Sequence, residues 1–90
     1  MHMPSDFETQ LRSQGYQEVA AISRDAGYAL GEHSHPFDAC ALIVSGDITL
    51  TVAGVASTYA VGSVFELPRN TPHHEHAGAQ GVSYIAGRRT

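Results

Sequence analysis

Residues 27–46 read GYALGEHSHPFDACALIVSG and combine two closely spaced histidines with an uninterrupted apolar run. His33 and His35 are two positions apart, which in an extended strand places both imidazoles on one face, whereas in a helix they would diverge. The run at residues 39–44 that follows has no polar face, so we expect a strand covered on both sides by apolar material. One side can be the interior of a barrel and the other a subunit interface.

Outside this stretch, glycines divide the chain into further short runs of β-favouring residues. Together with the apolar run, they predict strands over residues 16–23, 39–44, 47–52, 55–60, 63–67, 73–77 and 82–86. Ile48 and Leu50 alternate with threonines, which gives one apolar and one polar face, and Ala53-Gly54 can turn the chain back as a hairpin. Short strands at this spacing predict an all-β sandwich or barrel.

The N-terminal segment carries a helix signal. Ser5 and Glu8 have the spacing of a capping box. Phe7 and Leu11 lie four positions apart on one helical face, and Gly15 can end the helix. We therefore expect one domain over residues 1–90, in which a short helix at about 5–14 precedes a barrel at about 16–87.

Composition limits the kinds of partner and compartment. The chain has 90 residues, a formal net charge of −4 and no lysine, so it lacks the clustered basic face that nucleic-acid binding requires. Cys40 is the single cysteine, which rules out an intramolecular disulfide. The absence of a signal-peptide pattern and of an apolar run of membrane-spanning length leads us to expect a cytoplasmic protein without membrane contact. Because so small a domain buries a modest share of its surface, we also expect a homodimer.

A second group of histidines follows Pro72 in the sequence His73-His74-Glu75-His76. A strand period of two places His73 and Glu75 on one face and the other two histidines on the opposite face. The preceding residues 68–72 read as a turn that delivers His73 first into the strand, so we predict that His73 and Glu75 face inward. Imidazoles with a carboxylate suit iron, manganese, nickel or zinc better than calcium. The alternative is a solvated histidine-rich turn.

The spacing of these residues resembles that of the cupin superfamily. Its first motif, G-x5-H-x-H-x3,4-E-x6-G, is matched by Gly27, His33, His35 and Gly46. Its second motif, G-x5-P-x-G-x2-H-x3-N, is matched by Gly62, Pro68 and His73. The resemblance implies a small double-stranded β-helix, a jelly-roll-like barrel, with a metal site among side chains that face inward.

The sequence departs from the cupin pattern at the metal-binding glutamate, whose position is taken by Ala39. Asn70 and Ala77 replace a glycine and an asparagine of the second motif, and Asn70 tolerates the left-handed backbone of a turn. Glu75 is our preferred substitute for the missing acid, either as a ligand or as an acid that hydrogen-bonds to a ligand or binds the substrate. Asp38 is the other candidate, and a turn residue is its simpler interpretation.

The predicted metal site thus comprises His33, His35, His73 and Glu75 around one divalent iron, manganese, nickel or zinc ion, with Glu75 as the catalytic residue. Such an ion, with open coordination positions, can act as a Lewis acid or activate water or dioxygen. These features predict a small-molecule metalloenzyme of the dioxygenase, isomerase or lyase type. The alternative is a non-catalytic module that binds or senses a small molecule, and the substrate is not identified.

The strand beside the first histidine pair is expected to divide its residues between two environments. Ala39, Ala41 and Ile43 would line the space beside the metal and leave room for a small ligand, or equally form ordinary core. Cys40 would point away from that space, as a buried small hydrophobic residue and not as a ligand or nucleophile.

Other residues have several interpretations. Tyr59, Phe65 and Tyr84 either line the mouth of a pocket or pack inside the barrel. Arg88 and Arg89 are interpreted as a solvated C-terminal tail.

Overall fold

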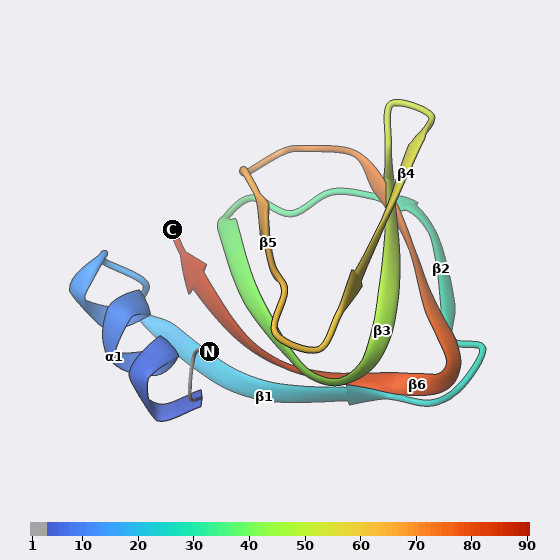
Figure 1. Cartoon of the computed structure of the whole chain (residues 1–90). Coiled ribbons are helices and arrows are strands. Elements are labelled where there is room, and N and C mark those ends of the chain that lie inside the picture. The colour runs from blue at the N-terminus through green and yellow to red at the C-terminus, as the bar shows by residue number, and fades with distance from the viewer. Residues whose placement is uncertain (1–3) are drawn as a thin grey trace.

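One helix and six antiparallel strands make up the structure, a computed structural model that describes residues 4–90 (Figure 1). The elements are α1 (Pro4–Ser13), β1 (Glu18–Arg24), β2 (Ala29–His33), β3 (Asp38–Val52), β4 (Val55–Ala60), β5 (Val64–Leu67) and β6 (His73–Arg89). The predicted all-β barrel with a short N-terminal helix is confirmed. Residues 1–3 of the predicted domain lie outside the described part of the chain.

Two long strands, β3 and β6, organise the barrel by pairing with each other along most of their length. The first half of β3 and the second half of β6 form one half-sheet, with β1 beside β6 and β5 beside β3. The remaining halves form a second half-sheet, with β2 beside β6 and β4 beside β3. Because each long strand curls from one half-sheet into the other, the two half-sheets face each other across the interior (Figure 1).

The bend between the half-sheets corrects two of the predicted boundaries. Residues 39–44 and 47–52 form the single strand β3, and residues 73–77 and 82–86 belong to the single strand β6. Two irregularities in the β3–β6 register, between Ile43 and Ser45 and between Gly46 and Ile48, let the ladder continue through the bend. Strand β2 was not predicted, because Ala29–His33 contains no β-branched residue.

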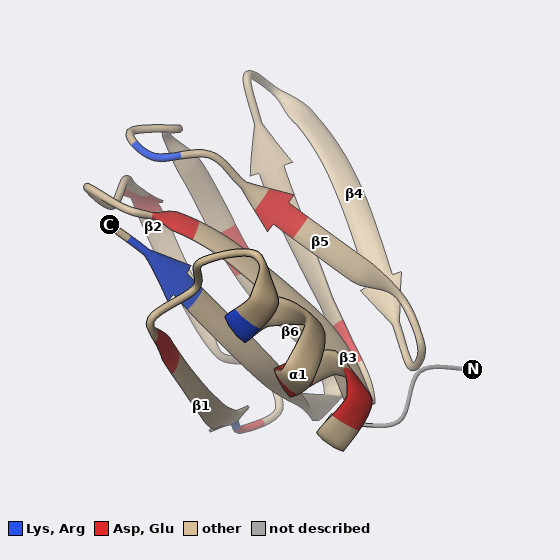
Figure 2. Ribbon diagram, turned by 90° about the vertical axis from the view of Figure 1, so that its left-hand side faces the viewer, with Lys and Arg blue, Asp and Glu red and all other residues tan. Residues whose placement is uncertain are grey.

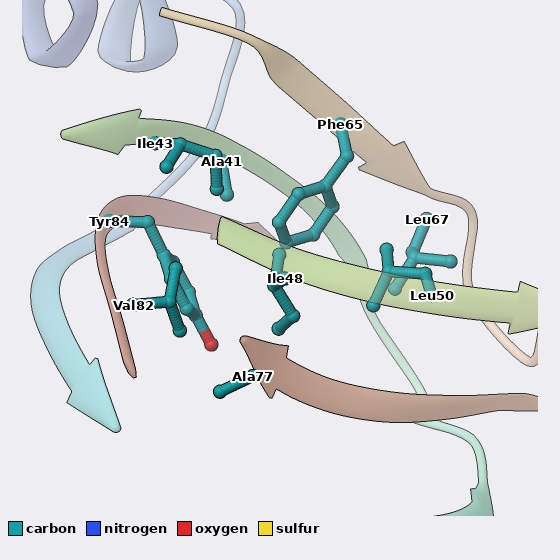
Figure 3. Packing of buried hydrophobic residues seen from close by; sticks show 9 residues of the cluster. All are labelled: Ala41, Ile43, Ile48, Leu50, Phe65, Leu67, Ala77, Val82 and Tyr84. Carbon is teal, nitrogen blue, oxygen red and sulfur yellow. The ribbon is translucent and has the colours of Figure 1, made fainter. Parts of the chain in front are cut away.

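The core lies between the two half-sheets (Figure 3). Its buried members are Ala41, Ile43, Ile48, Leu50, Phe65, Leu67, Ala77, Val82 and Tyr84. Ile48 and Leu50 point inward as the alternation with threonine predicts, and Ala53-Gly54 forms the tight turn to β4. Both turn residues have positive φ angles, 51° and 80°, as a two-residue hairpin turn of this kind requires.

Helix α1 covers the outer face of β3 and β6 (Figure 2). Phe7 and Leu11 pack against Cys40 and Leu42, which are the outward-facing residues of the apolar run. The chain's own helix thus covers Cys40 and Leu42 on the face where a subunit interface was expected, and Val44 on the same run is 36% exposed. Helix α1 has ten residues, and no helix in the described part of the chain is long and apolar enough to cross a membrane.

Candidate metal centre

The ends of β2 and β6 bring the four predicted site residues together. His33 is the last residue of β2 and pairs with His73, the first residue of β6, while Glu75 lies two positions further along β6. A register shift after Leu30 adds one residue to β2. Without this bulge, Glu32 would stand opposite His73, so the bulge selects His33 for the site.

His35 completes the cluster from the connection between β2 and β3. The three histidine rings lie close together, with centroids 4.2 to 5.1 Å apart. One ligand atom from each of His33, His35, His73 and Glu75 lies within 4.8 Å of the other three. The structure therefore gathers all four residues at one point of the inner surface.

The carboxylate of Glu75 lies between two of the rings. Its Oε2 atom is 2.9 Å from Nε2 of His33 and 3.2 Å from Nε2 of His73. Neighbouring ligands on an ion with bonds of about 2.1 Å are separated by about 3.0 to 3.4 Å, so these distances match adjacent ligand positions. His73 is 1% exposed, and the side chain of Glu75 is 13% exposed, so water has little access to this contact.

Backbone carbonyls determine which nitrogen of each ring faces the carboxylate. Nδ1 of His33 donates to the carbonyl of Gly31 at 2.7 Å, and Nδ1 of His73 donates to the carbonyl of Thr71 at 2.9 Å. Because a carbonyl oxygen only accepts, Nδ1 is the donor in each ring, and Nε2 is the atom that each ring turns toward Glu75. In the neutral form of this tautomer Nε2 offers a lone pair, so an ion seated between the two rings and the carboxylate would bind all three atoms. The donor set therefore fits a transition-metal ion.

His35 is held in the neutral form that a ligand requires. Burial lowers the pKa of its imidazole, and the neighbouring rings of His73 and His33 lower it further. The ring of Phe37 stacks on His35 with centroids 4.8 Å apart, which limits the orientations of the imidazole.

The two alternative acids have different surroundings. Asp38, the first residue of β3, is not a turn residue and does not face the histidines. It accepts hydrogen bonds from the backbone N–H and the guanidinium of Arg69 and from the guanidinium of Arg89. The hydrogen bond from the Arg69 backbone, followed by those from the two side chains, lowers the pKa of Asp38 to about 2. Glu75 is therefore the acid that the structure places beside the histidines.

A cavity of about 340 Å³ opens beside the cluster. His33, His35 and Glu75 form part of its wall, and Ala39 and Ala41 form another part, as predicted. Ile43 packs in the core and does not line the cavity.

The sequence left open whether the aromatic residues line a pocket or pack inside the barrel, and the structure shows both. Phe65 and Tyr84 line the cavity and also pack in the core, with ring centroids 5.8 Å apart. Tyr59 packs against Phe65 at 5.5 Å and does not line the cavity. His74 and His76 are exposed on the outer face of β6.

The expected C-terminal tail is wrong, because Arg88 and Arg89 belong to β6. Arg89 pairs with Asp38, while Arg88 lines the cavity. Arg24, at the end of β1, lines the same cavity and was not singled out in the sequence. Strand parity could have found Arg88, since it follows the inward-facing Tyr84 and partly buried Ala86 at a period of two.

The sequence and fold are similar to those of known proteins. A family model described as a cupin domain matches residues 24–85. A conserved protein of unknown function from Streptococcus pyogenes is 26% identical, with a TM-score of 0.69, over 80% of this chain and 63% of that chain. KdgF from a Halomonas species is 21% identical, with a TM-score of 0.68, over 80% of this chain and 68% of that chain.

A variant of oxalate decarboxylase from Bacillus subtilis is 16% identical, with a TM-score of 0.71, over 79% of this chain and 20% of that chain. The present chain thus spans less than two thirds of the streptococcal protein and a fifth of the decarboxylase. No curated protein matches the sequence.

Proposed function

The chain belongs to the cupin domain family, and from this premise we propose that it is a small-molecule metalloenzyme whose divalent ion is held by His33, His35, His73 and Glu75. The observation that carries the proposal is the convergence of two Nε2 atoms and a carboxylate oxygen on one point at the cavity wall. Iron, manganese, nickel and zinc all suit these ligands.

The protein's own residues have distinct roles in this proposal. A bound ion would supply Lewis-acid polarisation of a ligand in the cavity. Glu75 both contacts the ligand nitrogens and lines the cavity, so its carboxylate can accept a proton from a molecule bound there. Dioxygenase, isomerase and lyase chemistries all use these elements.

The metal site is tested by elemental analysis of protein purified without a histidine tag or added metal. We expect about one transition-metal ion per chain, and loss of most of it in His33→Ala and in His73→Ala. His76→Ala is the matched control, because it removes an imidazole from the same strand but from the exposed face, and it should retain the metal. Equal loss in all three variants would contradict the assignment, as would a native protein that takes up no metal.

Glu75→Gln tests the role of the carboxylate. The amide keeps the size of the side chain but removes its charge, so we expect metal affinity to fall by about tenfold to a hundredfold in a competition titration with a chelator. Unchanged affinity would exclude Glu75 as a ligand. Metal-loaded protein that binds a small molecule without converting it would instead indicate a binding module.

A further inference from the structure

Two of the five arginines differ from the others in their electrostatic surroundings. Arg12 pairs with Glu8 at 3.1 Å, Arg69 with Asp38 at 3.4 Å and Arg89 with Asp38 at 3.2 Å. Arg24 and Arg88 form no ion pair with any carboxylate among residues 4–90, although the chain has an excess of acidic residues. Both of these arginines line the cavity beside the candidate metal centre.

The unpaired guanidinium groups are held by aromatic rings. Arg88 lies over the ring of Phe37 at 4.7 Å, and Arg24 lies over the ring of Tyr28 at 5.1 Å. Stacking of this kind orients the guanidinium plane but leaves its N–H donors free for another partner. Their fork geometry matches a bidentate oxyanion, and the mostly apolar lining of the cavity favours an organic carboxylate over inorganic phosphate.

Arg88 is the guanidinium nearer to the histidines. Phe37 stacks on His35 at 4.8 Å and on Arg88 at 4.7 Å, so these two distances place Arg88 less than about 10 Å from a predicted metal ligand. Arg24 stands six positions from Glu18, the cross-strand partner of Arg88, and so lies about 20 Å away along the β1–β6 wall. The two charges therefore lie toward opposite ends of this wall.

Tyr84 adds a neutral polar group between these charges. The residue lines the cavity. Burial raises the pKa of the Tyr84 phenol, so the hydroxyl keeps its proton and can donate it to an anion at neutral pH. Both Arg24 and Arg88 act in the opposite direction on this phenol, which is consistent with their position around the same cavity.

We propose that the cavity binds a small organic carboxylate whose anionic group pairs with Arg88 and whose apolar part lies against Ala41, Phe65 and Leu67. Arg24 adds a second positive charge to the same wall. The cavity volume of about 340 Å³ lies at the small end of the range of about 300 to 1,000 Å³ for small-molecule pockets, which suits a small ligand. Binding of a carboxylate by this cavity does not depend on the metal. Only the identification of this carboxylate as the substrate of the enzyme rests on the proposed function.

The proposal is tested with benzoate and benzamide, which have the same shape but differ in charge. Isothermal titration calorimetry on the whole protein at low ionic strength should show benzoate binding at least about tenfold more tightly than benzamide. Equal affinities for the two compounds would overturn the proposal. This comparison needs no substitution and so does not depend on the stability of a variant.

Substitutions then assign the preference to particular residues. Arg88→Gln should remove most of the preference for benzoate, Arg24→Gln should reduce it by a smaller factor, and Arg88→Lys should retain part of it. Arg12→Gln removes the same charge from α1, outside the cavity, and should leave both affinities unchanged. Glu18→Gln removes the carboxylate opposite Arg88 and should leave benzoate binding unchanged or slightly tighter.

Metal content measured on the same samples separates this proposal from the metal site. A benzoate preference that persists in Arg88→Gln together with full metal content would assign the anion to the metal centre and would overturn the role of Arg88. A preference that depends on Arg88 in protein that binds no metal would support the carboxylate site and contradict the metalloenzyme proposal.

Discussion

Asp38 shows how one carboxylate can join three segments of a small barrel. Through its two oxygens it binds Arg69, in the turn after β5, and Arg89, near the end of β6. The donors stabilise the charged form, with the backbone N–H of Arg69 as the largest contribution, and the pKa falls from 3.8 to about 2. The folded state therefore holds this proton less tightly than the unfolded chain.

Asp38→Asn should make this linkage measurable as a change in stability with pH. The pKa of Asp38 is lower in the folded protein, so its contribution is complete above about pH 4 and is lost as the pH falls toward about 2. The difference in unfolding free energy between wild type and variant should therefore be largest at neutral pH and decrease through this range. Urea unfolding at several pH values measures it, and a difference that stays constant from pH 7 to pH 2 would contradict the assignment.

The sequence predicts residues of the site where local spacing determines direction. Glu75 could be chosen over Asp38 because it has the same strand parity as His73. The partners of Asp38 could not be predicted, since Arg69 and Arg89 lie 31 and 51 residues further along the chain. Arg88 was missed because the apolar run that predicts this strand ends at residue 86, whereas β6 continues to Arg89.

Glycines at the bend allow β3 and β6 to pass from one half-sheet to the other. Gly46 and Gly81 both have positive φ, 68° and 74°. A Cβ atom on Gly46 would collide with the carbonyl group of Gly81, so the backbones can approach this closely only without a side chain. The bend therefore depends on the absence of a methyl group at residue 46.

Gly46→Ala should destabilise the barrel more than Gly54→Ala, which is its matched control. Both glycines have positive φ, which costs alanine about 1 to 2 kcal/mol, but a Cβ atom on Gly54 meets nothing within 4 Å. The collision at the bend should add about 1 to 3 kcal/mol in Gly46→Ala. Urea denaturation of the two variants measures this difference, and equal unfolding free energies would show that the bend can adjust.

At the level of elements, the sequence distinguishes a turn from a bend poorly. Ala53-Gly54 separates two strands and was predicted correctly, because the run before it alternates and a small residue followed by glycine suits a tight turn. Gly46 also separates two apolar runs, but a bulge keeps them in one strand. A glycine with positive φ occurs both in a hairpin turn and in a bend within one strand. Only the pairing of β3 with β6 distinguishes the two.

In the whole molecule, apolar side chains are exposed along one edge of the sheet. Val55, in the edge strand β4, is 67% exposed, and Val61, just beyond its end, is 63% exposed. An edge strand has unpaired backbone groups that can bind a second chain. The homodimer therefore stays a prediction, with this edge in place of the outer face of β3 as the expected interface.

Light scattering coupled to size-exclusion chromatography should give a mass about twice the 9.6 kDa of one chain. Val61→Glu should shift the protein toward the monomer, because it places a charge in the apolar edge. Ala26→Glu, at an exposed position in the connection between β1 and β2, is the control and should remain dimeric. A monomeric wild type at all concentrations would contradict the prediction.

Cys40 makes the docking of α1 chemically observable. The thiol is 5% exposed beneath the helix, and burial raises its pKa to about 11, so it is both shielded and protonated at neutral pH. Labelling by a thiol reagent should therefore be faster when the helix lifts from the sheet, and its rate reports how often this local opening occurs. The chain thus carries a reporter of its own, placed beneath the contact between its helix and its barrel.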